Sequence, residues 1–295
     1  MASVEVPIAS SSRATIIQDA FGDFRSEIDA YNDRRDRLIK ASRDITTASK
    51  RLIFHLHRFP HSAFGKEIQP KSQAGKILAE GKLKKDEIVS MIIDLARKEG
   101  LTTEEYVGGG IGNDVSMEGT IPDKFEPGRA TRYDRAYGGG LEEFIEAISF
   151  LHFLEYGNVI TLEEVQSLFA KDNNIILPVT PQRYVLGLSD LSGELMRFAT
   201  NALGDGDAHG VVSDVLRILR SLSTGLDPFV PLIRDFRKKQ QVTKQSTRKI
   251  EDLSYAVKVR TSEFGSDQNA LREMVRRALA GDGAGNSGEN NVDDP

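Results

Sequence analysis

The sequence predicts an all-α protein, built as a single-domain bundle of about seven helices with a long N-terminal helix. Proline, which breaks helices, occurs ten times in 295 residues and is absent from 8–59, 128–177 and 232–294. Within these stretches the apolar residues recur every three to four positions, as on one face of a helix. No stretch has the alternating pattern of a half-buried strand, so we expect helices packed on helices.

The first helix is expected over 14–58, and its apolar residues keep a seven-residue spacing. This spacing predicts packing against a neighbouring helix along one stripe. The stripe consists of Ile17, Phe24, Tyr31, Leu38, Ile45 and Leu52.

The next helices are expected over 73–98, where Gly81 permits a break, and over 141–156, which is apolar nearly all round and therefore buried. Thr161 and Glu164 form a capping box that starts a short helix over 162–170. Three longer helices follow. The first has Thr180 as N-cap and Pro181 at its first position, and the others are expected over 211–222 and 232–264, with a possible short helix at 268–280.

One helical domain is expected over 14–264. Residues 1–13 are Ser-rich and 265–295 end in an acidic Gly/Asn tail, so both segments should be mostly disordered. The stretch 101–140 contains two glycine runs and is expected to be a flexible insertion. It does not predict a nucleotide-binding loop, because no strand precedes the glycines and no Gly-Lys-Ser/Thr follows them.

The chain has no cysteine, which excludes disulfides and cysteine-ligated zinc. No secretory signal or membrane-spanning stretch is evident, so we expect a cytoplasmic and nuclear protein. The formal net charge is −5, but 31–60 carries eight Lys/Arg against three Asp/Glu, and 232–260 carries nine against three. These basic segments, rather than the net charge, would hold a phosphate chain.

Four acidic residues have a spacing that suits a metal site. Glu143 and Glu146 lie three positions apart on the apolar third helix, and Asp190 and Glu194 lie four apart on the fifth. Oxygen ligands of this kind suit Mg²⁺ or Mn²⁺, and such a site can activate water for phosphodiester hydrolysis. Spacing alone leaves the alternative open, since acids three or four apart are common on solvated helix faces.

Several segments together resemble the translin family, and within it the branch called translin-associated factor X. The resemblance covers roughly 21–263 and is carried by 37–45 (RLIKASRDI), 49–57 (SKRLIFHLH), 141–150 (LEEFIEAISF), 179–181 (VTP), 188–197 (LSDLSGELMR) and 255–263 (YAVKVRTSE). The stretch 101–140 and the tail after Gly265 lie outside the matched pattern.

The resemblance implies the seven-helix translin bundle and a hetero-octamer with translin, named component 3 promoter of the RNA-induced silencing complex. That complex is a Mg²⁺-dependent endoribonuclease for single-stranded RNA, acting on small-RNA passenger strands and transfer-RNA processing fragments; single-stranded DNA is a further candidate ligand. The family's catalytic, metal-binding acids match Glu143, Glu146, Asp190 and Glu194. Glu142 competes with Glu143 because it also lies one turn from Glu146, and the motif favours Glu143. The alternative function is a non-catalytic nucleic-acid-binding adaptor that stabilises translin.

Basic residues on three expected helices are candidates for RNA contact, with solvated helix faces or ion pairs as the alternative. They are Arg43, Lys50, Arg51, Arg197, Lys258 and Arg260. His55 and His57 are expected to be structural, and Tyr184 and Phe198 to belong to the core rather than to base-stacking platforms.

Overall fold

The computed structural model describes residues 13–102, 128–171, 174–205, 209–264 and Glu273. Within these residues the chain forms seven α-helices and two single 3₁₀ turns, which confirms the all-α class. The helices are α1 (Arg13–Leu56), α2 (Gln73–Lys98), α3 (Arg129–Tyr156), α4 (Leu162–Ser167), α5 (Pro181–Asp205), α6 (His209–Leu226) and α7 (Phe236–Phe264), with the turns η1 (His61–Ala63) and η2 (Asp227–Phe229).

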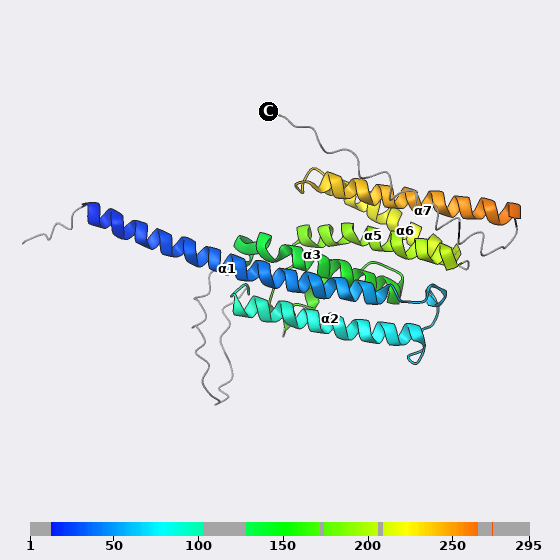
Figure 1. Cartoon of the computed structure of the whole chain (residues 1–295), viewed down its shortest axis with the longest axis horizontal. Coiled ribbons are helices and arrows are strands. Elements are labelled where there is room, and N and C mark those ends of the chain that lie inside the picture. The colour runs from blue at the N-terminus through cyan, green and yellow to red at the C-terminus, as the bar shows by residue number, and fades with distance from the viewer. Residues whose placement is uncertain (1–12, 103–127, 172–173, 206–208, 265–272, 274–295) are drawn as a thin grey trace, which may run out of the picture.

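Helix α3 lies at the centre of the bundle, because it packs on α1 along one side and on α5 along another. Helix α2 lies beside α1, and α6 and α7 pack against α5, so the helices run roughly alongside one another (Figure 1). The buried aromatic rings of Phe150, Phe153 and Phe198 meet edge to face between α3 and α5. The nearly all-round apolar sequence of α3 therefore produces the central helix, as expected.

Helix α1 divides into a packed half and a projecting half. Leu38, Ile45 and Leu52 are buried, in agreement with the expected stripe. The preceding half projects beyond the other helices (Figure 1), and Phe21 and Phe24 on it are 66% and 57% exposed. Among the described residues, the expected neighbour along the stripe is present only for the second half of the helix.

Two glycines set how closely the helices approach α3. A Cβ on Gly140 would lie 2.7 Å from the carbonyl oxygen of Ser42 on α1, and the Gly140 N–H donates a hydrogen bond to the Ser42 hydroxyl (2.9 Å). A Cβ on Gly187 of α5 would lie 2.7 Å from the Ile145 side chain. These contacts bring α1 and α5 against α3 at the level of the predicted acids.

The expected flexible insertion at 101–140 is wrong over its last part, because α3 begins at Arg129 and includes the glycine run 138–140. Glycine costs about 1 kcal/mol in a helix interior, but the close packing at Gly140 requires its lack of a side chain. The part of the expected insertion at 103–127 lies outside the described residues, as do 1–12 and, apart from Glu273, the tail from 265.

The helix starts follow the expected capping chemistry. Thr161 and Glu164 form the capping box that starts α4, and the hydroxyl of Thr180 accepts a hydrogen bond from the Arg183 N–H (3.3 Å) at the start of α5. Helix α2 continues through Gly81, which contacts the side chain of Leu56.

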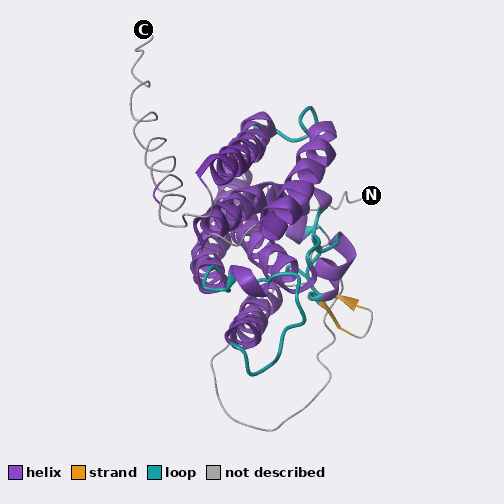
Figure 2. Ribbon diagram, turned by 90° about the vertical axis from the view of Figure 1, so that its right-hand side faces the viewer, coloured by secondary structure: helices purple, strands orange, loops and turns teal. Residues whose placement is uncertain are grey.

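Two strands that the sequence did not predict lie beyond α4. They are β1 (Ala170–Lys171) and β2 (Asn174–Ile175), an antiparallel pair at the edge of the bundle (Figure 2). Strands of two residues are too short to show an alternating pattern. No helix in the described part of the chain is long and apolar enough to cross a membrane.

Candidate functional site

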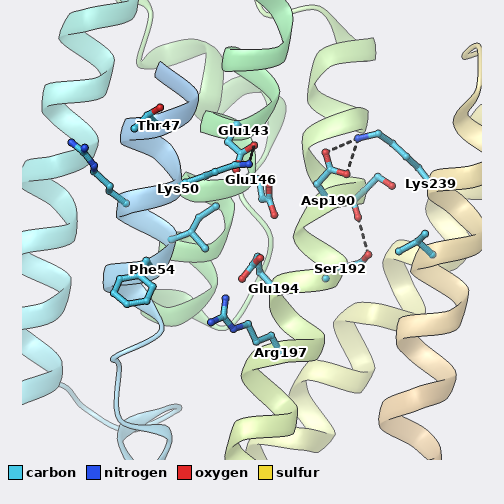
Figure 3. Close-up of a pocket in the computed structure, with 15 residues that line it drawn as sticks. Thr47, Lys50, Phe54, Glu143, Glu146, Asp190, Ser192, Glu194, Arg197 and Lys239 are labelled. Carbon is cyan, nitrogen blue, oxygen red and sulfur yellow. Dashed lines mark hydrogen bonds and ion pairs between the residues drawn. The ribbon is translucent and has the colours of Figure 1, made fainter. Parts of the chain in front are cut away.

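The four predicted acids line one pocket of about 880 Å³. Helix α3 contributes Glu143 and Glu146, and α5 contributes Asp190 and Glu194, with Asp190 turned toward Lys239 on α7 (Figure 3). Helices α1 and α7 complete the pocket. The structure therefore brings together acids that are up to 51 positions apart in sequence.

Glu142 and Glu143 occupy different environments, although they are neighbours on α3. The carboxylate of Glu142 pairs with Arg183, whose guanidinium also donates to Asp134 (3.0 Å). Glu143 instead lines the pocket, whereas Glu142 does not. The geometry thus favours Glu143 as the partner of Glu146, as the sequence motif does.

Glu146 is the most deeply placed of the four acids, with 8% of its surface exposed. Burial, together with the negative charges of Asp190, Glu143 and Glu194, raises the pKa of its carboxyl group to about 8. No side chain in the described part of the chain donates a hydrogen bond to Glu146 or forms an ion pair with it. A buried carboxyl surrounded by other carboxyls favours either a proton or a bound cation.

The other three acids each contact a cationic or ionisable group of the protein. Lys239 on α7 donates to both oxygens of Asp190, at 2.7 and 2.6 Å. The Lys50 Nζ lies 3.8 Å from Glu143, and burial raises the pKa of that carboxyl group. His57 Nε2 bonds to the Glu194 carboxylate.

The donor set fits a hard divalent cation in its chemistry. All four side chains offer carboxylate oxygens, which Mg²⁺ and Mn²⁺ prefer. Glu146 has no compensating protein cation in direct contact, so a bound cation would offset its charge. Within the described ranges, however, no three acidic or histidine side chains already form a ready-made metal cluster. A metal would therefore compete with the lysine and histidine contacts of the other acids.

Three of the six basic residues proposed for RNA contact line the same pocket, namely Lys50, Arg51 and Arg197. Arg43 on α1 and Lys258 on α7 are exposed but do not line the pocket. The side chain of Arg260 lies outside the described part of the structure. The pocket thus combines acids on two helices with basic groups on α1 and α5.

Three residues of the pocket region were not predicted to take part in the site. Lys239 donates to Asp190. Phe54 lines the pocket with 68% of its surface exposed. His57 bonds to Glu194, and its ring centroid lies 4.8 Å from that of Phe150. Phe54 follows Lys50 by four positions and Arg51 by three, so helical spacing could have indicated a shared face. No local signal indicates the contacts of Lys239 or His57, because these depend on which helices become neighbours.

The remaining candidate side chains have structural contacts. His55 is buried, and its Nε2 lies 2.9 Å from the carbonyl oxygen of Ile77. Phe198 is fully buried, and the hydroxyl of Tyr184 donates to the carbonyl of Ile160 (2.6 Å). These contacts agree with the structural roles expected for His55, Tyr184 and Phe198.

A family model described as "Translin family" matches residues 33–106 and 115–261. Translin-associated protein X from Pongo abelii is 32% identical over 267 residues, covering 83% of this chain and 79% of its own. The protein of the same name from Rattus norvegicus is 32% identical, covering 87% and 82%, and the homologue from Schizosaccharomyces pombe is 26% identical, covering 84% and 90%.

Two solved structures share the fold. A chain of AfC3PO is 19% identical with a TM-score of 0.53 and covers 81% of this chain and 97% of its own. A chain of the AfC3PO complex with duplex RNA is 18% identical with a TM-score of 0.52 and the same coverage.

Proposed function

The chain belongs to the translin family, and from this premise we propose that it is the catalytic subunit of a Mg²⁺-dependent endoribonuclease complex that cleaves single-stranded RNA. The observation that carries the proposal is that four carboxylates line one pocket beside basic side chains. Two relatives named translin-associated protein X are about 32% identical to the chain. A translin subunit is the proposed partner, in a hetero-oligomer that we expect to be an octamer.

Glu143, Glu146, Asp190 and Glu194 would hold the metal. When bound, Mg²⁺ would lower the pKa of water and offset the charge that develops on the phosphodiester. The protein's own contribution is to keep these carboxylates on two rigid helices that the Gly187 contact holds close together. Such placement by packed helices gives a site more precise than one built on loops.

Lys50, Arg51 and Arg197 would bind phosphates on either side of the bond that is cleaved. Contacts of this kind do not depend on base sequence, which suits varied substrates such as passenger strands and transfer-RNA fragments. They also weaken as salt concentration rises. Because these basic side chains line the same pocket as the acids, an RNA bound to them would pass beside the carboxylates.

The second candidate function is a non-catalytic nucleic-acid-binding adaptor that stabilises translin. The observation that favours it is the pairing of Asp190 with Lys239. The lysine donates to both carboxylate oxygens, which a metal would need as ligands. An adaptor would keep the basic pocket for RNA but would not cleave.

The test is cleavage of a labelled single-stranded RNA by the chain co-purified with a translin partner, in Mg²⁺ and in EDTA. We expect Mg²⁺-dependent cleavage that falls at least about 100-fold in Glu146→Gln, a loss typical of removing a transition-state contact, while RNA binding persists. The matched control is Glu155→Gln, the same change on α3, where the carboxylate pairs with Lys82 outside the pocket. No cleavage by a well-assembled wild-type complex would favour the adaptor, and equal cleavage by Glu146→Gln would place the active site elsewhere.

A further inference from the structure

Phe54 is the only aromatic side chain among the described residues that line the acid pocket. It is 68% exposed, in contrast to the core rings of Phe150, Phe153 and Phe198, which are fully buried and meet edge to face. No ring contact involving Phe54 occurs within the described part of the chain. Within the described residues its ring face is therefore open, and its place in the pocket makes it available to a ligand.

The position of Phe54 on α1 joins it to the basic groups. Thr47, Lys50, Arg51 and Phe54 have the three- and four-residue spacing of one helix face, and all four line the pocket. The buried seam of α1 passes through Leu38, Ile45 and Leu52 instead. Phe54 is thus turned toward the pocket together with two candidate phosphate-binding side chains.

Phe54 also lies on the same helix as a side chain that contacts one of the carboxylates. Lys50 Nζ is 3.8 Å from Glu143, and Phe54 is four residues further along the helix, a rise of about 6 Å. Figure 3 shows Phe54 near the end of α1, while Glu194 and Arg197 lie on α5, and all three residues line the pocket. A phosphate beside the acids would place a neighbouring base at the level of this ring.

We propose that Phe54 is the stacking platform for one unpaired nucleobase next to the bond that is cleaved, and that it thereby selects single-stranded over duplex RNA. The proposal rests on the proposed function, since it assumes that RNA enters this pocket. Every base has a flat face that stacks on an aromatic ring, so the contact tolerates sequence. In a duplex both faces of a base are covered by its neighbours, so Phe54 gains no stacking partner there.

The experiment measures binding of single-stranded RNA to the assembled complex in EDTA, where cleavage does not consume the probe. The RNA carries 2-aminopurine or an abasic site at successive positions, and the variants are Phe54→Ala, Phe54→Leu and Phe54→Tyr. Tyr255→Ala removes another exposed aromatic, which lies on α7 and does not line the pocket, and it serves as the matched control.

We expect Phe54→Ala and Phe54→Leu to weaken binding about 5- to 100-fold, the usual effect of losing one stacked base. Phe54→Tyr and Tyr255→Ala should bind as the wild type does. At one RNA position, an abasic site should weaken binding to the wild type but not to Phe54→Ala. The fluorescence of 2-aminopurine at that position should be quenched on binding only when residue 54 is aromatic. Duplex affinity should be the same for all variants.

Three outcomes would overturn the proposal. Equal binding by Phe54→Ala and wild type at every probe position would remove Phe54 from RNA recognition and leave the proposed nuclease activity untouched. Loss of the partner subunit from Phe54→Ala, detected by size-exclusion chromatography, would assign the ring to a subunit interface. Failure of the wild-type complex to bind any single-stranded RNA would overturn the proposed function together with this inference.

Discussion

The buried carboxyl group of Glu146 should make the free energy of unfolding of the protein depend on pH. Its pKa is about 8 in the folded protein against 4.5 for an ordinary glutamate, so between these values the folded state binds more protons than the unfolded state. The free energy of unfolding should therefore decrease as pH rises through this window, and Glu146 contributes no such change below about pH 4.5. Glu146→Gln cannot ionise, so near pH 8 it should exceed the wild type in stability by roughly 2–4 kcal/mol.

This difference is measured by chemical denaturation of both proteins in EDTA at several pH values, with Glu155→Gln as control. The two proteins should have similar stability near pH 5 and diverge as pH rises. Added Mg²⁺ should reduce the divergence, because a cation on the carboxylate replaces the proton. A constant stability difference across the range would show that the Glu146 carboxyl group is not held in its protonated form.

That the four acids line one pocket could be expected from the resemblance of their motifs to the translin family, whereas their spacing alone left a solvated helix face open. The lysine and histidine that contact these acids could not be predicted. Lys239 reaches Asp190 from a helix 49 positions away, and His57 reaches Glu194 across 137 positions. Such contacts depend on the rotation and register of packed helices, which periodicity does not determine.

At the scale of single helices, the approach of α5 to α3 depends on Gly187. A Cβ there would lie 2.7 Å from Ile145 and 2.9 Å from the carbonyl oxygen of Glu142. Gly187→Ala should therefore destabilise the protein by about 1–2 kcal/mol, because the overpacking outweighs the gain in helix propensity. It should also lower the cleavage rate, since Asp190 follows Gly187 by three residues and would move away from Glu146.

Gly139→Ala is the matched control on α3, since nothing lies within 4 Å of its would-be Cβ. This substitution should stabilise the protein by about 0.5–1 kcal/mol. Urea denaturation and single-turnover cleavage measure both variants. Wild-type stability and activity in Gly187→Ala would show that the α3–α5 contact can relax without consequence.

Several element boundaries agree with the sequence prediction, among them both ends of α2 and the starts of α4 and α5 after the caps Thr161 and Thr180. The start of α3 was misplaced because glycine runs indicate loops when the neighbours are unknown. Gly140 is helical because Ser42 packs against it, at a separation of 98 residues. Helix propensity predicts secondary structure poorly at positions where tertiary packing requires a small residue.

For the whole molecule, the projecting half of α1 predicts where a partner binds. Residues 16–30 carry four acidic residues and one basic one, together with exposed Ile17, Phe21, Phe24 and Ile28. An apolar stripe of this kind with heptad-like spacing is expected to pack on another helix. Because the described helices leave it exposed, the partner must come from outside the described part of the chain.

The double variant Phe21→Glu and Phe24→Glu should lower the affinity for the translin subunit at least about 10-fold, since it places charges in an apolar contact. Circular dichroism should show an unchanged helix content. Leu83→Glu, at a residue of α2 that is 65% exposed, is the control and should assemble normally. Size-exclusion chromatography with light scattering reports the assembly, and a fully assembled double variant would place the interface elsewhere.

The central claim is that a metal held by the four acids contacts the phosphate that is cleaved. The most direct test is cleavage, by the wild-type complex, of RNA with one non-bridging phosphate oxygen replaced by sulfur. Mg²⁺ prefers oxygen ligands and Mn²⁺ accepts softer ones. We therefore predict that one phosphorothioate stereoisomer is cleaved slowly in Mg²⁺ and recovers in Mn²⁺, and that Glu146→Gln abolishes the recovery. Equal cleavage of the oxygen and sulfur substrates in Mg²⁺, or cleavage that persists in EDTA, would contradict the account.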